Sequence, residues 1–450
     1  MNFSLFLFCL LGIQAFCLYI GRKGCSGIRD RESYFLAGRS LKTFPLMMTF
    51  IATQIGGGVL LGAAEEAFCY GYGVVLYPLG VALGLIFLGI GPGRKLASGS
   101  LVTVIAIFQE VYGSKTLRKI AFILSALSLF FILVAQVVAL DKLFGAFPYG
   151  KVFATLFWII LGCYTSTGGF RGVVRTDVIQ ALFLLAAVIA CGYAVWSCAP
   201  QVIEVVQKFQ PLSFAKLSSW VFMPMLFMLI EQDMVQRCVA ASSPKNLQIA
   251  AISAGCVILA FNFIPLFLGT LGAKAGILGS CPLIDTVTYF CGPSFAAIMA
   301  AAVGVAILST ADSLISALAQ LISEEIPMMR VAHYRYLVLG LAAAAPLVAI
   351  GFTNIVDVLI LSYSLSVCCL SVPIGFSLLF HYQPSSASGW AAVLSGGISY
   401  ALTCYFSIRN FGDLFSWLCS LFAFLCVESL CIFWIRYQQK QERDFISHKE

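Results

Sequence analysis

The apolar stretch 294–322 contains a cluster of hydroxyl side chains that could bind a cation. Positions spaced i, i+3, i+4 and i+7 share one face of a helix. The residues at that spacing here are Ala306, Ser309, Thr310 and Ser313, with Asp312 beside them. A hard cation such as sodium prefers several oxygen ligands at once. The alternative is that the hydroxyls bond to carbonyl groups one turn earlier in their own helix. The neighbouring aspartate favours the cation site.

A run of glycines interrupts a second apolar stretch, 44–68, where Thr53-Gln54-Ile55 is followed by Gly56, Gly57 and Gly58. Each glycine lowers helix stability by up to about 1 kcal/mol relative to alanine. Every backbone group inside a membrane needs a partner, so an interruption there indicates a cavity or a bound ligand. The run predicts a broken helix with free carbonyl groups. Close packing of small residues against another helix is the alternative interpretation.

A third stretch, 217–234, carries Pro224 and ends in Glu231-Gln232-Asp233. Proline removes one helix hydrogen bond, and acidic groups near lipid usually face water or a partner. Two interrupted membrane helices are typical of transporters built from inverted repeats. Asp177, which follows Arg175 at the start of the stretch 177–198, is either a charge that stabilises a helix N-terminus or a second carboxylate for cation coupling.

The composition places these stretches in a lipid bilayer. Of the 450 residues 60% are apolar and only 10% are charged, whereas a soluble domain carries roughly a quarter charged residues. Apolar runs long enough to cross a membrane number about thirteen. Their approximate limits are 2–20, 44–68, 72–93, 119–141, 152–168, 177–198, 217–234, 248–273, 294–322, 334–352, 356–381, 389–407 and 412–435.

Charge sets the orientation. Because Arg22 and Lys23 follow the first run, we expect a retained helix with its N-terminus outside rather than a cleaved signal peptide. With that orientation most of the 27 lysine and arginine residues, Arg237 among them, fall in cytoplasmic segments. The exceptions in outer segments are Lys142, Lys151, Lys208, Lys216, Lys274 and Arg409. The C-terminus is then cytoplasmic.

Other classes of protein are disfavoured. No basic face suggests nucleic-acid binding. The three histidines have no spaced catalytic partners, so we expect no enzyme. Most of the 17 cysteines lie within apolar runs, where they act as small hydrophobic residues. Cys281 and Cys291 share one predicted outer loop, and whether they pair stays open.

Five motifs follow one another along the chain: Ser33-Tyr-Phe-Leu-Ala-Gly-Arg-Ser-Leu41, Ala52-Thr-Gln-Ile-Gly-Gly-Gly58, Gly168-Gly-Phe-Arg-Gly-Val-Val-Arg-Thr-Asp-Val-Ile-Gln180, Gln232-Asp-Met-Val-Gln-Arg237 and Leu308-Ser-Thr-Ala-Asp-Ser-Leu314. With these motifs the chain resembles the sodium:solute symporter family over nearly its whole length. That family includes sodium-coupled glucose, proline, pantothenate and choline carriers.

The resemblance implies an all-α polytopic membrane protein with a LeuT-type inverted repeat of five plus five helices. The single transporter domain, 1–450, would comprise an extra N-terminal helix (2–20), a first repeat (44–198), a second repeat (217–381), two accessory helices (389–435) and a cytoplasmic tail (436–450). Carried over by position, the family's sodium site would use the residues Ala52, Ile55, Ala306, Ser309 and Thr310. A second cation site, present in some members, would lie near Asp177, Asp312 and Ser313.

The predicted substrate site departs from the choline carriers, which resemble this chain at the glycine run but place tryptophan where it has Gln54 and Glu231. A quaternary ammonium needs aromatic faces, so choline is disfavoured. The predicted substrate-binding residues are Gln54, Gly57, Glu231 and Gln232, whose polar groups suit a solute that donates and accepts hydrogen bonds.

The sequence therefore predicts a secondary transporter in the cell inner membrane that couples inward sodium flow to uptake of a small organic solute. Proton coupling is the main alternative, because Asp177 and Asp312 could carry protons. A non-transporting sensor on the same fold is another. The solute, the stoichiometry and the oligomeric state stay open.

Overall fold

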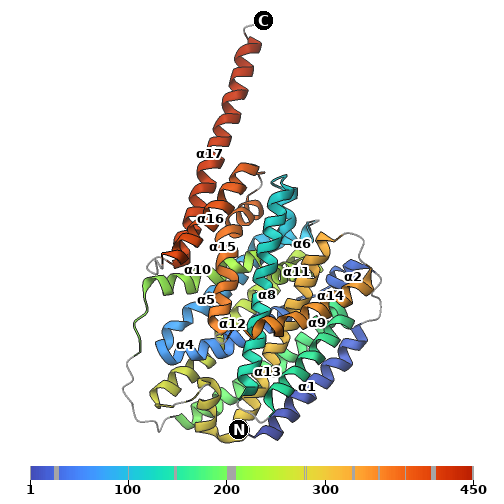
Figure 1. The fold of residues 1–450 in the computed structure, drawn as a ribbon, viewed down its shortest axis with the longest axis vertical. Coiled ribbons are helices and arrows are strands. Elements are labelled where there is room, and N and C mark those ends of the chain that lie inside the picture. The colour runs from blue at the N-terminus through green and yellow to red at the C-terminus, as the bar shows by residue number, and fades with distance from the viewer. Residues whose placement is uncertain are drawn as a thin grey trace.

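The structure, a computed structural model, describes residues 2–24, 30–99, 101–145, 149–199, 209–277, 279, 281–326, 330–352, 355–380, 382–406 and 412–447. It is helical throughout this part, and the β-type pairing recorded there is one isolated bridge between Leu41 and Ala241. Helices satisfy their backbone groups internally, as a chain this apolar requires in lipid. The two ends of the described chain lie at opposite ends of the bundle (Figure 1).

The elements are α1 (Phe3–Gly24), α2 (Arg31–Phe35), η1 (Ala37–Arg39), α3 (Thr43–Gln54), η2 (Gly58–Gly62), α4 (Ala63–Tyr70), η3 (Gly71–Val75), α5 (Leu76–Ile90), α6 (Pro92–Ser98), η4 (Val104–Ala106), α7 (Ile107–Glu110), α8 (Lys115–Gly145), α9 (Gly150–Cys198), α10 (Phe214–Ile230), α11 (Gln232–Ala240), α12 (Pro244–Lys274), α13 (Pro282–Glu325), α14 (Val331–Ala349), α15 (Ile355–Leu379), α16 (Ser386–Tyr405) and α17 (Gly412–Ser447). Local chemistry fixes several starts. Ser213, Ser243 and Ser385 cap α10, α12 and α16, each accepting a hydrogen bond from the backbone N–H three residues later.

Helix α13 forms the centre of the bundle. Its residues 299–321 are buried without exception, and it packs against α1, α8, α9 and α12. Helix α17, in contrast, extends beyond the other helices and exposes large apolar side chains such as Phe422 and Phe433 (Figure 1). A buried α13 can hold polar groups away from lipid, so the hydroxyl cluster lies where a cation site requires it.

Two long helices bend at glycines with a positive φ. Gly169 (φ 54°) divides α9, and Gly292 (φ 81°) divides α13. Side-chain-bearing residues rarely adopt such angles. A Cβ on Gly169 would also lie 2.8 Å from the carbonyl oxygen of Tyr34, so α2 approaches α9 closely. The hydroxyl of Tyr34 donates to the carbonyl of Ser166 at 2.9 Å, which anchors the first motif to α9.

The structure confirms the predicted break in the glycine run. Helix α3 ends at Gln54, and Ile55 has a non-helical backbone (φ −92°, ψ 69°). A short π-helical turn, η2, follows before α4.

The second predicted interruption, within 217–234, is also confirmed. Pro224 lies inside α10, and the break is at Glu231 (φ −71°, ψ 120°), where α10 and α11 meet at 51°. Proline removes one backbone hydrogen bond of the helix, and in a membrane protein neighbouring helices can supply a partner for the freed carbonyl group.

The count of crossings stays a prediction. In the described part, nine helices are long and apolar enough to cross a membrane, or ten if the bent pair α10–α11 is one span. The sequence predicted about thirteen. Part of the difference arises because the predicted spans 152–168 and 177–198 form one element, α9, that turns at a single glycine. Helix α17 also continues to Ser447, through most of the predicted tail.

Candidate cation and solute sites

The hydroxyl cluster of α13 lies directly against the break in α3. The hydroxyl of Ser309 donates to the carbonyl of Ala52 at 3.1 Å, and that of Thr310 donates to the carbonyl of Thr53 at 3.0 Å. Ser309 is also 3.0 Å from the carbonyl of Ala306 in its own helix. The same hydroxyl therefore contacts its own helix and the freed carbonyl opposite, and the cation site stays a prediction. These oxygens from two helices could surround a small cation.

The glycine run allows this approach. A Cβ on Gly56 would lie 2.5 Å from the hydroxyl oxygen of Thr310. A Cβ on Gly57 would lie 2.8 Å from Ile307 and 2.9 Å from Ala139. Close packing, the alternative interpretation of the run, is therefore present together with the break.

The structure brings four of the five residues predicted for the sodium site into mutual contact. Ala52, Ala306, Ser309 and Thr310 come together through the hydrogen bonds above. Ile55 lies at the break itself, and among the described contacts its N–H donates to the carbonyl of Ile51. The carbonyl of Thr53, which the sequence did not single out, is the one closest to the Thr310 hydroxyl.

An arginine lies in the second predicted cation site. The guanidinium of Arg237 donates to Ser313 at 2.7 Å, lies 3.5 Å from the Asp177 carboxylate and also bonds Thr53. Its Nε donates to Thr49, which in turn bonds Asp177. Arg237 is 0% exposed and lies in α11, so it is a core charge rather than a loop charge, and its expected side of the membrane stays a prediction.

The third member of that predicted site, Asp312, has a different partner. The hydroxyl of Tyr164 donates to its carboxylate at 2.7 Å. The other oxygen of Asp312, and one oxygen of Asp177, accept no hydrogen bond from the described residues. The only sequence signal for Arg237 was its place in the Gln232–Arg237 motif, since nothing local distinguishes it from an orientation charge.

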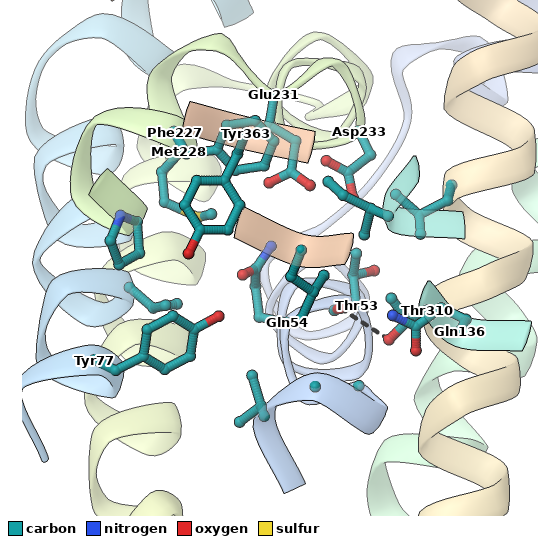
Figure 2. Close-up of a pocket in the computed structure, with 18 residues that line it drawn as sticks. Thr53, Gln54, Tyr77, Gln136, Phe227, Met228, Glu231, Asp233, Thr310 and Tyr363 are labelled. Carbon is teal, nitrogen blue, oxygen red and sulfur yellow. Dashed lines mark hydrogen bonds between the residues drawn. The ribbon is translucent and has the colours of Figure 1, made fainter. Parts of the chain in front are cut away.

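A small cavity of about 70 Å³ lies between the breaks of α3 and of α10–α11 (Figure 2). Its lining residues are Thr53, Gln54, Gly56, Gly58, Val59, Tyr77, Val81, Ile132, Gln136, Pro224, Phe227, Met228, Glu231, Asp233, Thr310, Leu314, Leu359 and Tyr363. Two predicted substrate-binding residues, Gln54 and Glu231, are among them. Because Thr53 and Thr310 also line it, the cavity adjoins the candidate sodium site.

The other two predicted substrate-binding residues do not line this cavity. The amide of Gln232 accepts from the N–H of Val104 at 3.0 Å and donates to Gln320 at 3.2 Å, so it ties α11 to η4 and α13. The N–H of Gly57 donates to Gln136 at 3.3 Å. Gln232 and Gly57 therefore hold neighbouring elements in place and do not line the cavity themselves.

A wider vestibule of about 630 Å³ borders the cavity and shares Gly58, Tyr77, Leu359 and Tyr363 with it. Lys216 and Glu66 form an ion pair at 2.9 Å on its wall. The ammonium of Lys216 also lies over the ring of Tyr70, 3.6 Å from its centre.

Two further observations concern metal ligands and thiols. In the described part of the chain no group of three or more His, Cys, Asp or Glu side chains could hold a metal ion. Cys281 and Cys291 are both free thiols in the structure.

Comparison with known proteins agrees with this geometry. Residues 34–331 match the Sodium:solute symporter family. The chain is 30% identical over 196 residues to the high-affinity choline transporter 1 of Drosophila melanogaster, covering 43% of this chain and 32% of that protein. It is 30% identical over 219 residues to the sodium/pantothenate symporter of Escherichia coli (strain K12), covering 45% and 43%. These matches span less than two thirds of the relatives' own length.

Solved structures share the fold. A Na⁺-coupled sialic acid symporter in a substrate-bound outward-open state aligns with a TM-score of 0.75 at 15% identity, covering 95% of this chain and 97% of that one. MhsT in complex with L-phenylalanine aligns with a TM-score of 0.61 at 14% identity, covering 85% and 98%. The predicted all-α polytopic fold of the LeuT type is thereby confirmed, and its division into two five-helix repeats stays a prediction. The family match covers more than half of the chain, which therefore belongs to the sodium:solute symporter family.

Proposed function

We propose that this membrane protein is a secondary transporter that couples inward sodium flow to uptake of a small organic solute. The observation that carries the proposal is the contact between the α13 hydroxyls and the carbonyl groups freed at the α3 break. Sodium would be held by Ala52, Thr53, Ile55, Ala306, Ser309 and Thr310. The solute would occupy the adjoining cavity beside Gln54 and Glu231, supported by Gly57 and Gln232.

Coupling follows from the position of the ion between two helices. A sodium ion that bridges α3 and α13 favours the arrangement in which both sets of oxygens face each other. If the solute cavity is complete only in that arrangement, each ligand raises the affinity of the other by the same factor. A membrane potential that is negative inside adds about 2.3 kcal/mol per charge for each 100 mV.

We retain one sodium site in the proposal. At the second predicted site, near Asp177, Asp312 and Ser313, the Arg237 guanidinium already supplies a positive charge. Proton coupling is the second candidate, favoured by the free carboxylate oxygens of Asp177 and Asp312.

We place the protein in the cell inner membrane, with its N-terminus outside and its C-terminus in the cytoplasm. The described ends lie at opposite ends of the bundle, which fits termini on opposite sides of the membrane, and the basic residues after the first helix favour an outer N-terminus (Figure 1).

The proposal is tested with sodium alone, because the solute is unidentified. Ligands that bind the folded protein raise its thermal stability. We expect sodium, compared with potassium at equal ionic strength, to raise the Tm of the purified full-length protein. The double variant Ser309→Ala, Thr310→Ala should lose this shift.

The matched control is Ser395→Ala with Ser399→Ala, which removes two hydroxyls of α16 that bond carbonyls of their own helix at 2.6 Å. The control should keep the sodium shift. A sodium shift of equal size in the Ser309/Thr310 variant would reject the site, and a response to pH in place of sodium would favour proton coupling.

A further inference from the structure

The solute cavity carries negative charge without a matching positive charge on its wall. Glu231 and Asp233 both line it, whereas no lysine, arginine or histidine is among its described lining residues. Glu231 is 6% exposed and Asp233 is 0% exposed. A carboxylate taken out of water is costly unless it is paired with a cation or a proton. The two carboxyl groups on the cavity wall are therefore stabilised by a cation in the cavity or by a proton held between them.

The oxygens of these carboxyl groups are open to a ligand. Oε2 of Glu231 and both carboxylate oxygens of Asp233 accept no hydrogen bond from the described residues. Glu231 also interacts with Gln54 and Asp233. Figure 2 shows both carboxyl groups directed toward the side where Thr53 and Gln54 lie. Two carboxylates this close repel each other, and a cation or a shared proton between them relieves the repulsion.

The nearest arginine does not neutralise them by contact. Arg237 reaches Asp233 through the backbone carbonyl, to which its Nη1 donates at 3.0 Å. Its other donors bond the hydroxyls of Thr49, Thr53 and Ser313 and face Asp177. The guanidinium therefore lies next to the cavity through Thr53, but its hydrogen bonds go to groups other than the side-chain oxygens of Glu231 and Asp233.

A count of buried charge gives the same result. In the described core the buried carboxylates around the two sites are those of Asp177, Glu231, Asp233 and Asp312, and the buried basic side chain is Arg237. With one proton shared between Glu231 and Asp233, the four carboxyl groups carry three negative charges, and one guanidinium and one sodium ion still leave one of them uncompensated. A positively charged solute at Glu231 would supply the missing charge.

Aromatic side chains complete the cavity. Tyr77, Phe227 and Tyr363 line it, and the rings of Phe227 and Tyr363 lie 5.6 Å apart. Aromatic faces attract a cation. Gln54 and the tyrosine hydroxyls add groups that can accept hydrogen bonds from a donor-bearing solute.

The geometry points to a small organic cation with N–H donors, a primary or secondary ammonium, as the solute class. This inference rests on the proposed function and specifies its solute. The ammonium hydrogens bond Oε2 of Glu231 and a carboxylate oxygen of Asp233. A quaternary ammonium has no N–H and leaves these buried oxygens without a partner, which is unfavourable. An anionic solute meets two carboxylates of like charge.

The volume of the cavity limits the size of the charged end of the solute. At roughly 10–15 Å³ for each water-sized position, a cavity of about 70 Å³ accommodates about five to seven non-hydrogen atoms. A larger substituent extends past Tyr77 and Tyr363 into the vestibule, which shares these residues.

The test compares four probes of similar size: n-propylammonium, propionamide, propionate and tetramethylammonium. Each is added at millimolar concentration to the purified full-length protein in sodium, and the Tm is measured. We expect n-propylammonium to raise the Tm most. An equal or larger shift with propionate, propionamide or tetramethylammonium overturns the inference, as does no shift with n-propylammonium.

A substitution tests whether Glu231 binds the n-propylammonium probe. We expect Glu231→Gln to weaken n-propylammonium binding by about thirtyfold or more, the low end for loss of one partner in a buried charge pair. The control is the same chemical change at the exposed Glu110, Glu110→Gln, which should leave binding unchanged. Unaltered binding in Glu231→Gln contradicts the inference.

The sodium shift separates this inference from the proposed function. If wild-type protein responds to sodium but not selectively to n-propylammonium, the solute class is wrong and the sodium site stands. If the sodium shift is absent, the proposed coupling fails regardless of the probes. Should Glu231→Gln not fold, the four-probe comparison on the wild-type protein decides alone.

Discussion

Two polar clusters lie against α13, and they handle positive charge differently. The cluster at Ser309 and Thr310 consists of hydroxyl and carbonyl groups without formal charge. The cluster at Ser313 contains the carboxylate of Asp177 and the permanently charged guanidinium of Arg237. Neutral oxygens can release an ion when the helices separate, whereas a tethered arginine cannot leave. In the proposed function, the core therefore holds one exchangeable cation at the first cluster beside the fixed cation at the second.

The largest effect is expected from removing the fixed cation. Arg237→Met deletes the partner of Asp177 and Ser313 while keeping much of the side-chain volume. Breaking a buried ion pair in this way costs about 3–5 kcal/mol, because it leaves an uncompensated charge. We expect a sharp fall in folded yield and Tm. A variant with wild-type Tm would show that the arginine is dispensable and would break the comparison.

The next effect concerns the close approach that forms the exchangeable site. Gly56→Ala places a methyl group against Thr310, and overpacking of this kind costs about 1–3 kcal/mol. We expect a weaker sodium-induced Tm shift together with a lower Tm. Gly12→Ala is the matched control, because nothing lies within 4 Å of a Cβ there. An intact sodium response in Gly56→Ala would mean that the α3–α13 contact does not hold the ion.

At Asp312 we expect a smaller effect on the sodium response than at Gly56, although the loss of stability is of similar size. Tyr164→Phe removes the hydrogen bond to Asp312. Hydrogen bonds to charged groups contribute about 1.5–3 kcal/mol, so the Tm should fall by a few degrees while the sodium response persists. Tyr72→Phe, at a half-exposed ring, serves as the control. Loss of the sodium response in Tyr164→Phe would place Asp312 in the exchangeable site.

The smallest effect is expected at the vestibule. Lys216→Met breaks the ion pair with Glu66. The side chains of Lys216 and Glu66 are 30% and 24% exposed. Such partly exposed pairs contribute about 0–1 kcal/mol. The Tm and the sodium response should change little. A large loss of sodium response would show that the Lys216–Glu66 pair is coupled to the cation site. The comparison of the two clusters against α13 predicts no such coupling.

The sequence was sufficient where a local pattern decides the structure. The helical spacing of Ser309 and Thr310 placed their hydroxyls on one face, and three consecutive glycines predicted the break after Gln54. Both features depend on backbone propensity within a few residues, so no knowledge of neighbouring helices was needed.

The sequence was insufficient where distant segments meet. Nothing local distinguishes the buried Arg237 from an orientation charge, and its partner Asp177 lies 60 positions earlier in the chain. Gln232 looked like a solute ligand but turns toward Val104 and Gln320. The sequence predicted an interruption within 217–234 without locating it, and the break falls at Glu231, where two carboxyl groups adjoin the cavity. Packing between helices decides all three.

Equilibrium binding of radioactive sodium to the purified protein tests the central claim most directly. The account predicts one bound sodium ion per wild-type chain and none in the Ser309→Ala, Thr310→Ala variant. If the double variant binds as much sodium as the wild type, the ion is held elsewhere and the proposed coupling between α3 and α13 is wrong.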